Sequence, residues 1–319
     1  MKRTAAVPPS PLDPNVFLTG GCARSCLFCS ARGEDRVMTP AQVRQVLAAG
    51  YRSLVFEGGE PLLSKDLEKW VRAARRSGVE DVTVLTSGLQ LTPARLASLR
   101  RAGVDHFHFN FPSHVEKLHD LLTGTWGRFE TQLTAIKAAA AAGPGAAALV
   151  CVVNALNYRQ LPDYVEFAAR ELPGVLYIAF NFIKVKGLVK KRLWLVPELA
   201  EVKPFLLAAL RRARQLGLPC LVDGVPLCFL TGFEAYARDA DCLVRGDSTY
   251  LYEKRTVKAC ARCGLAPVCA GPRADYVALR GNRGFKAAPK GAAAAVIRQV
   301  RRGQLSLNRP ARPAKRGKA

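Results

Sequence analysis

The sequence predicts an α/β protein in which parallel strands and helices alternate along the chain. From residue 15 onward, short β-rich runs are separated by amphipathic runs of about a dozen residues. Such alternation implies parallel strand pairing through right-handed crossovers. A second observation is that the polar and glycine-rich clusters each follow a strand, which places them at one edge of the sheet. Six units before residue 184 favour a barrel-like layer, with an open doubly wound sheet as the alternative.

The elements follow in a regular order. The expected strands are 15–19, 53–59, 81–88, 104–111, 147–154 and 175–183. The expected helices are 39–50, 64–78, 92–103, about 128–142 and 161–172. Thr39 and Pro40 are typical of a helix start, Gly50 is typical of a helix end, and Ser64 is the expected cap of the second helix.

Three cysteines follow the first strand in GGCARSCLFCS, at positions 22, 26 and 29. The chain has ten cysteines and no recognisable secretory signal, so clustered thiols are expected to be metal ligands or catalysts in a cytoplasmic protein. Three thiolates can hold three irons of a [4Fe–4S] cluster and leave the fourth iron open. Structural zinc is the alternative, but it needs four ligands and no fourth Cys or His lies nearby.

The segment FEGGEPLL follows the second strand. Gly58 and Gly59 allow close backbone approach to a ligand, and Glu60 offers an anion to an ammonium group. An ordinary turn explains such a segment when it stands alone. Next to a cysteine loop with an open iron, it indicates a site for an amino acid that chelates that iron.

CARSCLFC and EGGEPLL together resemble the C-x3-C-x2-C signature and the glycine-rich motif of the radical S-adenosylmethionine superfamily. The resemblance extends over roughly residues 15–185, including LTSG and VDHFHFNFPS, and is similar to the branch of the molybdopterin-precursor cyclase and the peptide maturases. It implies a partial (β/α)6 barrel. It also implies that a reduced cluster cleaves S-adenosylmethionine to methionine and a 5′-deoxyadenosyl radical, which abstracts hydrogen from a substrate.

The resemblance also assigns roles to residues of this chain. The cluster ligands would be Cys22, Cys26 and Cys29. Phe28 would lie beside the adenine, and the methionine amine would be held by Gly58, Gly59 and Glu60. The carboxylate and ribose of the cofactor would be bound by Ser87, Asn110 and Asn154.

The strand HFHFN alternates in a way that places His106, His108 and Asn110 on one face. If Phe107 and Phe109 pack under the helices, His108 points into the barrel. A catalytic His108 and a hydrogen-bonded core histidine are both consistent with this pattern.

The C-terminal segment KACARCGLAPVCAG contains Cys260, Cys263 and Cys269. Cys228 can complete a set of four sulfurs, with Cys242 as the alternative. The spacing resembles the SPASM or twitch extension that carries auxiliary clusters. No cysteine follows in AGPRADY, so one auxiliary [4Fe–4S] cluster is expected, and structural zinc is the alternative.

These patterns divide the chain into an N-terminal tail at 1–13, a core barrel at 14–222, a Cys-rich extension at 223–289 and a basic tail at 290–319. The net charge is +23, and residues 273–319 contribute +12 of it through thirteen basic residues and one acidic residue. The tail is expected to be disordered, and a non-specific polyanion contact is one reading of its charge. The uncharged run 138–158 is broken by Gly143, Pro144 and Gly145, so no membrane span is expected.

Substrate identity is the least determined feature of the sequence. The cysteine arrangement slightly favours modification of a peptide, and modification of RNA or of a cofactor precursor is the alternative within the same chemistry. From another class, a non-enzymatic iron–sulfur or zinc protein that binds nucleic acid is the remaining alternative. A reductant such as flavodoxin or ferredoxin is the expected electron-donating partner.

Overall fold

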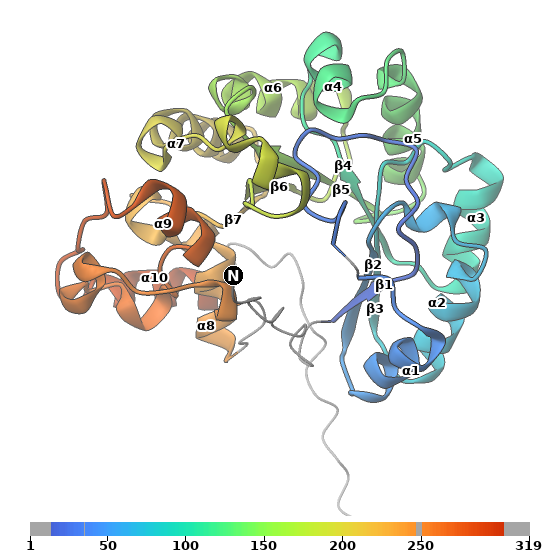
Figure 1. The fold of residues 1–319 in the computed structure, drawn as a ribbon, viewed down its shortest axis with the longest axis horizontal. Coiled ribbons are helices and arrows are strands. Elements are labelled where there is room, and N and C mark those ends of the chain that lie inside the picture. The colour runs from blue at the N-terminus through green and yellow to red at the C-terminus, as the bar shows by residue number, and fades with distance from the viewer. Residues whose placement is uncertain (1–13, 35, 247–250, 303–319) are drawn as a thin grey trace, which may run out of the picture.

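The computed structural model describes residues 14–34, 36–246 and 251–302. One parallel sheet contains seven strands in the order β1-β2-β3-β4-β5-β6-β7 (Figure 1). The strands are β1 Asn15–Phe17, β2 Ser53–Glu57, β3 Asp81–Thr86, β4 His106–Asn110, β5 Ala147–Val153, β6 Ile178–Phe182 and β7 Cys220–Asp223. In the described part of the chain β1 and β7 do not pair, so the barrel is open. The predicted α/β partial barrel is confirmed, and β7 extends it beyond the six expected strands.

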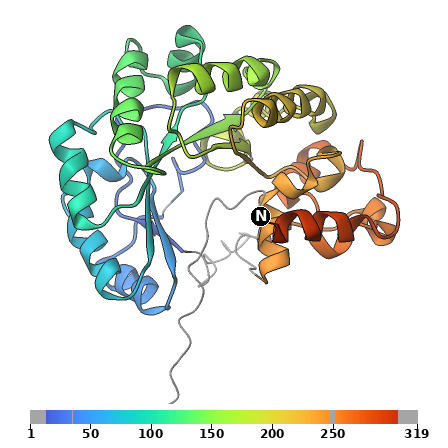
Figure 2. The same cartoon turned by 180° about the vertical axis from the view of Figure 1, so that it is seen from behind.

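Helices cover the outer face of this sheet, as Figures 1 and 2 show from opposite sides. Those of the barrel are α1 Pro40–Ala48, α2 Leu67–Arg76, α3 Pro93–Ala102, α4 Glu116–Thr123, α5 Phe129–Ala141, α6 Leu161–Glu171 and α7 Leu199–Gln215. Those of the C-terminal extension are α8 Arg238–Arg245, α9 Ala274–Arg280 and α10 Ala292–Arg301. None of these described helices combines the length and apolar character needed to cross a membrane.

Local capping explains where several helices begin. At α1, the Thr39 hydroxyl accepts from Gln42 N, and Gln42 Oε1 accepts from Thr39 N, which forms a capping box. Thr92 caps α3 in a similar way, accepting from Arg95 N. The expected Ser64 cap is wrong, because Ser64 ends the short 3-10 turn Pro61–Leu63 and α2 begins only at Leu67.

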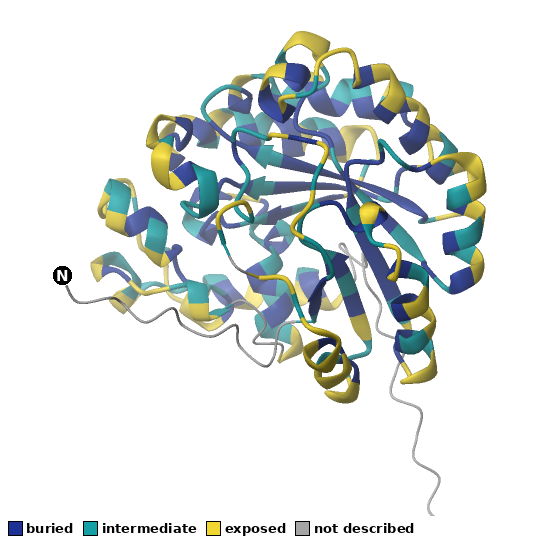
Figure 3. Cartoon of the chain, turned by 45° about the vertical axis from the view of Figure 1, so that its right-hand side comes forward, coloured by how far each residue is buried: buried dark blue, intermediate teal, exposed yellow. Residues whose placement is uncertain are grey.

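The two faces of the sheet differ in the size of their side chains. Phe107 and Phe109 are fully buried in the large core between sheet and helices. The opposite face carries a smaller cluster of Ala148, Val150, Tyr177 and Ala179. In Figure 3 the strands are largely buried and exposed residues concentrate on the outer helices.

The C-terminal region corrects the predicted boundary of the tail. Residues 292–301 form α10, with Ala293, Val296 and Val300 buried, so the prediction of disorder from residue 290 is wrong for this segment. Alanine-rich sequence with apolar residues at helical spacing outweighs the local positive charge. The rest of the predicted tail, 303–319, lies outside the described residues, as does the predicted N-terminal tail 1–13.

The extension is fixed to the barrel next to the end of β6. Arg273 is 3% exposed and donates to the carbonyls of Phe182 at 2.9 Å and Ile183 at 2.6 Å. Lys184 and Lys186 both pair with Glu253, at 2.7 and 2.6 Å. Burial acts to raise the pKa of Glu253, but these two lysines lower it to about 2. The extension is therefore anchored at the carboxyl end of the barrel by charged contacts as well as apolar packing.

Candidate functional site

The loop that carries the first three cysteines lies between α4 and the segment after β6. On one side, Ser25 N donates to Thr123 O at 3.0 Å and Leu27 N to Leu122 O at 2.8 Å. On the other side, Leu188 N donates to Cys29 O at 2.9 Å. These contacts join segments that are far apart in sequence and hold the loop over the carboxyl ends of the strands.

The three thiols are half-buried and receive backbone hydrogen bonds. Arg24 N donates to Cys22 Sγ at 3.4 Å, and Arg32 N donates to Cys29 Sγ at 3.3 Å. Burial raises the pKa of Cys26 to about 12, with the Arg24 charge opposing the shift, and burial also raises the pKa of Cys22. Thiolates at these positions are therefore favoured when a metal compensates for the loss of water.

The glycine-rich motif packs directly against this loop. Gly59 N donates to Thr19 O at 2.8 Å, and Glu60 N donates to Gly21 O at 2.7 Å. A Cβ added at Gly59 would lie only 2.2 Å from Gly21 O, so no larger residue fits without a backbone shift. The structure thus brings together the two motifs that sequence spacing placed one strand apart.

Glu60 is 1% exposed and joins the ends of β2 and β3. Its carboxylate accepts from Thr86 Oγ1 at 2.5 Å, from Ser87 N at 2.8 Å, from the Ser87 hydroxyl and from Leu62 N at 3.2 Å. A carboxylate has about four acceptor positions. Glu60 therefore acts as a structural acceptor here, and its contact with a ligand ammonium stays a prediction.

Two variants separate these roles of Glu60. Glu60→Ala leaves buried donors of Thr86 and Ser87 without an acceptor, so the free energy of unfolding should fall by about 1–3 kcal/mol per group, measured by denaturant titration. Glu60→Gln removes the charge and keeps one acceptor oxygen, while its NH2 group replaces the other oxygen, so its free energy of unfolding is measured too. If Glu60 holds an ammonium group, Glu60→Gln should weaken S-adenosylmethionine binding roughly ten- to a hundredfold, on the order of 1.5–3 kcal/mol. An unchanged dissociation constant in Glu60→Gln would limit Glu60 to its structural role.

Two buried acceptors at neighbouring strand ends have no hydrogen-bond partner among the described residues. They are Asn110 Oδ1, at the end of β4, and Gln90 Oε1, after β3. Buried acceptors are normally satisfied, so these two oxygens suit the donors of a bound ligand. Asn110 was predicted as a binding residue; Gln90 was not, although it ends the polar segment TSGLQ.

The other predicted binding residues are engaged within the protein. Ser87 donates its hydroxyl to Glu60. Asn154 is fully buried and uses both side-chain polar atoms in the turn after β5, donating to Val152 O at 2.9 Å and accepting from Leu156 N at 3.0 Å. Phe28 is 5% exposed and packs in the main core. Roles for these three side chains in cofactor binding stay predictions.

His108 faces the inner side of the sheet, because Phe107 and Phe109 occupy the opposite face. Its Nε2 lies 3.0 Å from the hydroxyl of Tyr177. Burial, with the neighbouring charge of His106, lowers the pKa of His108 to about 3, so its imidazole is neutral at physiological pH. The hydrogen bond accounts for a structural histidine, and a catalytic role stays a prediction.

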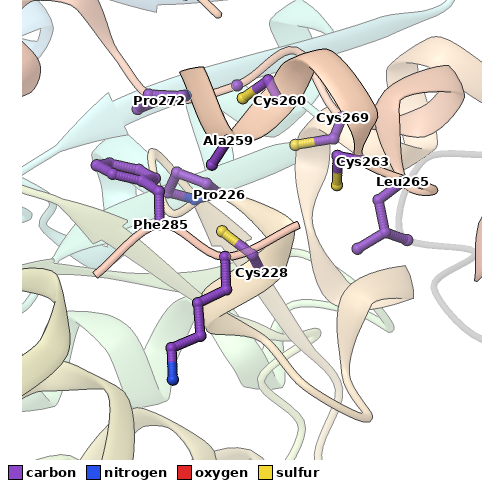
Figure 4. Close-up of a pocket in the computed structure, with 11 residues that line it drawn as sticks. Pro226, Cys228, Ala259, Cys260, Cys263, Leu265, Cys269, Pro272 and Phe285 are labelled. Carbon is purple, nitrogen blue, oxygen red and sulfur yellow. The ribbon is translucent and has the colours of Figure 1, made fainter. Parts of the chain in front are cut away.

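Four cysteines of the extension line one cavity. Cys228, Cys260, Cys263 and Cys269 border a space of about 310 Å³ that is partly open to solvent. In Figure 4, Cys228 extends toward the loop that carries the other three. Cys242 is buried in α8 and is not among the described residues that border this cavity. The geometry therefore supports Cys228 over Cys242 as the fourth member of this set.

Backbone N–H groups surround these sulfurs. Ala288 N donates to Cys263 Sγ at 3.3 Å. Burial raises the pKa of Cys228, and the Lys286 N–H opposes the shift. Burial also raises the pKa of Cys269 to about 11, opposed by the N–H groups of Leu227 and Gly271. Donors of this kind stabilise metal-bound thiolate and tune iron–sulfur centres.

A single metal ion needs several donor atoms that lie close together. Among the described residues, no three His, Cys, Asp or Glu side chains are gathered closely enough to hold one metal ion. Zinc–sulfur bonds of about 2.3 Å require four sulfurs in a tight tetrahedron.

Part of the chain matches a known protein family. Residues 16–168 match the model described as "Radical SAM superfamily". A probable GTP 3′,8-cyclase of Sulfurisphaera tokodaii is 30% identical over 163 residues, which span 49% of this chain and 51% of the cyclase. The match therefore covers about half of each protein. It favours an enzyme over the alternative of a non-enzymatic nucleic-acid-binding protein.

Solved structures show the same fold. Streptococcus suis SuiB bound to precursor peptide SuiA has a TM-score of 0.55 at 19% identity, covering 67% of this chain and 49% of SuiB. "Native anSMEcpe with bound AdoMet and Cp18Cys peptide" has a TM-score of 0.59 at 14% identity, covering 94% and 97% of the two chains. At these identities the two neighbours show the fold alone. With its cysteine loop packed against the glycine-rich motif and its open parallel barrel, this chain carries a radical SAM domain over residues 16–168.

Proposed function

We propose that this enzyme uses Cys22, Cys26 and Cys29 to hold three irons of a [4Fe–4S] cluster that reductively cleaves S-adenosylmethionine. The observation that carries this proposal is the direct packing of the cysteine loop on Gly59, so a cluster held by this loop would lie beside the glycine-rich strand end. When bound and reduced, such a cluster would supply the one electron needed to cleave the sulfur–C5′ bond of S-adenosylmethionine into methionine and a 5′-deoxyadenosyl radical, which would take hydrogen from a substrate.

The chain's own groups would bind and orient the cofactor. The backbone around Gly58 and Gly59 approaches the loop closely enough to contact the methionyl end. The unpaired oxygens of Asn110 and Gln90 offer acceptors to hydroxyl or amine donors. The half-buried position of the loop limits access of water to the reacting atoms.

Anaerobic turnover of the intact protein tests this proposal. After reconstitution with iron and sulfide, addition of S-adenosylmethionine should change the electron paramagnetic resonance spectrum of the dithionite-reduced protein. Methionine and 5′-deoxyadenosine should then form in equal amounts, measured by chromatography. Protein that holds iron and sulfide at the first site, but neither changes its spectrum nor forms these products, would contradict the proposal.

We also propose an auxiliary [4Fe–4S] cluster on Cys228, Cys260, Cys263 and Cys269. Support comes from the shared cavity and from the N–H donors that surround these sulfurs. Because Cys269 and the anchoring Arg273 are only four residues apart, this site is held close to the carboxyl end of β6. An auxiliary cluster at this position is placed to bind a substrate or to accept an electron from a product radical.

A peptide is the substrate class that the extension supports best. The neighbour whose fold covers 94% of this chain, anSMEcpe, was solved with a bound peptide. Likeness at 14% identity shows only the fold, so the substrate is tested directly. Cys-containing synthetic peptides should increase 5′-deoxyadenosine formation above the rate without substrate, and deuterated peptide should transfer label into it.

GTP is the control for the alternative. The partial match to a probable GTP 3′,8-cyclase makes a nucleotide the second candidate. If GTP increases 5′-deoxyadenosine formation and is consumed, while peptides have no effect, a nucleotide replaces a peptide as the assigned substrate class. A flavodoxin- or ferredoxin-like reductant, a polyanion partner for the basic tail and a cytoplasmic location stay predictions.

A further inference from the structure

Arg24 is a buried cation within the first cysteine loop, between Cys22 and Cys26. It is 3% exposed, whereas arginine is rarely buried unless it is paired. Its Nη1 donates to Asn110 O at 3.0 Å and its Nη2 to Gln132 Oε1 at 2.7 Å. No ion pair of the described chain includes Arg24, and its Nε has no partner there. The guanidinium is thus hydrogen-bonded to neutral acceptors, and burial lowers the pKa of Arg24 from its ordinary value.

Neutral side chains fix the position of this charge. Gln132 accepts from Arg24 and donates through Nε2 to Asn110 O at 3.0 Å. His119 Nε2 lies 2.7 Å from Gln132 Oε1 and 3.5 Å from Arg24 Nη2. Gln132 and His119 are both fully buried. Through these contacts the cysteine loop, the end of β4, α4 and α5 share one buried network.

A buried charge without an ionic partner is costly unless a counter-charge lies nearby. Three cysteine thiolates and the cluster they would hold carry negative charge, and the Arg24 backbone N–H already donates to Cys22 Sγ at 3.4 Å. The charge of Arg24 acts most strongly on Cys26 among its neighbours. The carboxylates of Glu60 and Asp120 also act on Arg24, so an open cluster on the three cysteines would add to the negative charge around this arginine.

We propose that Arg24 is a positioning residue that stabilises the reduced form of the open cluster and fixes the loop to Asn110. This inference rests on the proposed function, because it requires a redox-active cluster on the three cysteines. Reduction adds one negative charge to the cluster, and a cation in a medium of low dielectric constant favours the more negative state. Loss of the Arg24 charge should make the cluster harder to reduce.

Arg24 also fixes the cysteine loop to the end of β4 through its hydrogen bond to Asn110 O. Asn110 O accepts from both Arg24 and Gln132, which orients the residue whose Oδ1 is unpaired. Movement of the loop would therefore change the distance between the open iron and Asn110. Variants that break the hydrogen bond from Arg24 to Asn110 O should lower the reduction potential of the open cluster. They should also bind S-adenosylmethionine more weakly.

The test is a redox titration of the reconstituted full chain, followed by electron paramagnetic resonance, with iron and sulfide content measured first. Arg24→Gln removes the charge. Gln132→Glu is nearly isosteric and places a carboxylate against the guanidinium, which neutralises the charge in place. In both variants the ratio of reduced to oxidised open cluster at a fixed potential should fall about tenfold, a shift of ~59 mV for one electron.

Arg32→Gln is the matched control. Arg32 belongs to the same loop and donates to Arg24 O at 2.8 Å, but its side chain is exposed and screened by water. Loss of the positive charge of Arg32 should alter the ratio of reduced to oxidised open cluster less than about twofold. Arg24→Lys keeps a positive charge with a different shape, and it should retain most of the wild-type potential while weakening S-adenosylmethionine binding.

The outcomes separate this inference from the proposed function. If Arg24→Gln and Gln132→Glu hold iron and sulfide but keep the wild-type reduction potential of the open cluster, the role of Arg24 is overturned. A shift in Arg32→Gln as large as that in Arg24→Gln would overturn it too. If Arg24→Gln fails to hold iron, Gln132→Glu decides alone. Loss of iron in both, and in Arg24→Lys, would show a purely structural residue and would also overturn the inference. Wild-type protein without a redox-active first cluster would instead contradict the proposed function.

Discussion

Cys26→Ala is expected to abolish formation of 5′-deoxyadenosine and methionine from S-adenosylmethionine. Cys26 is the middle ligand of the proposed set, and two remaining thiolates hold a cluster poorly. Its loop stays attached to α4 through the backbone of Ser25 and Leu27, so loss of the thiol should not unfold the barrel. The measurement is chromatography of products under anaerobic conditions with dithionite, together with iron content.

Cys151→Ala provides the control for loss of a thiol elsewhere. Cys151 is fully buried in β5 and belongs to neither cysteine set. Its substitution should leave product formation and iron content close to wild type, apart from a small loss of stability. Turnover that persists in Cys26→Ala with the same iron content would show that the cluster is held in another way.

The auxiliary site gives the second large effect. Wild-type protein should contain about eight irons per chain, from two four-iron clusters. Substitution of Cys260, Cys263 and Cys269 by alanine should halve this number and leave the spectrum of the open cluster intact. The free energy of unfolding should also fall, because a loop-rich segment gains order from its metal.

Single variants then identify the fourth ligand. Cys228 borders the cavity with the other three cysteines, whereas Cys242 lies buried in α8. Cys228→Ala should lose auxiliary iron, and Cys242→Ala should keep it. The opposite result would reverse the assignment of the fourth ligand. About four irons and one zinc in wild-type protein would make the extension a structural zinc domain.

Local signals in the sequence were sufficient for the barrel. Thr39 and Thr92 mark helix starts through hydrogen bonds to residues three positions away, which are readable without any tertiary contact. Periodicity placed six strands correctly, with ends differing by a few residues. The fold class therefore followed from patterns that repeat within a dozen residues.

The errors arose where local signals compete. Positive charge after residue 273 predicted a disordered tail, but Val296 and Val300 on one face of α10 find a buried surface that the charge pattern did not reveal. Helix α4 was missed between β4 and α5, although its Leu122 is fully buried. Whether a short amphipathic segment folds depends on the surface available to cover it.

The sequence also predicted that the cysteine loop and the glycine-rich motif lie side by side. Parallel strands end on the same side, so consecutive strand ends are neighbours in space whatever the side chains are. The same rule explains why Asn110 was found, since it ends β4. Strand order and chain direction were enough to indicate where the site lies.

The partners of its polar groups, by contrast, depended on contacts between distant segments. Glu60 was expected to face a ligand but is surrounded by donors from Thr86 and Ser87, 26 and 27 residues away. Arg24 is one of 48 basic residues in the sequence, and its burial depends on Gln132, 108 residues later. Burial and hydrogen-bond satisfaction are properties of packed elements, because a side chain loses water only when other segments close over it.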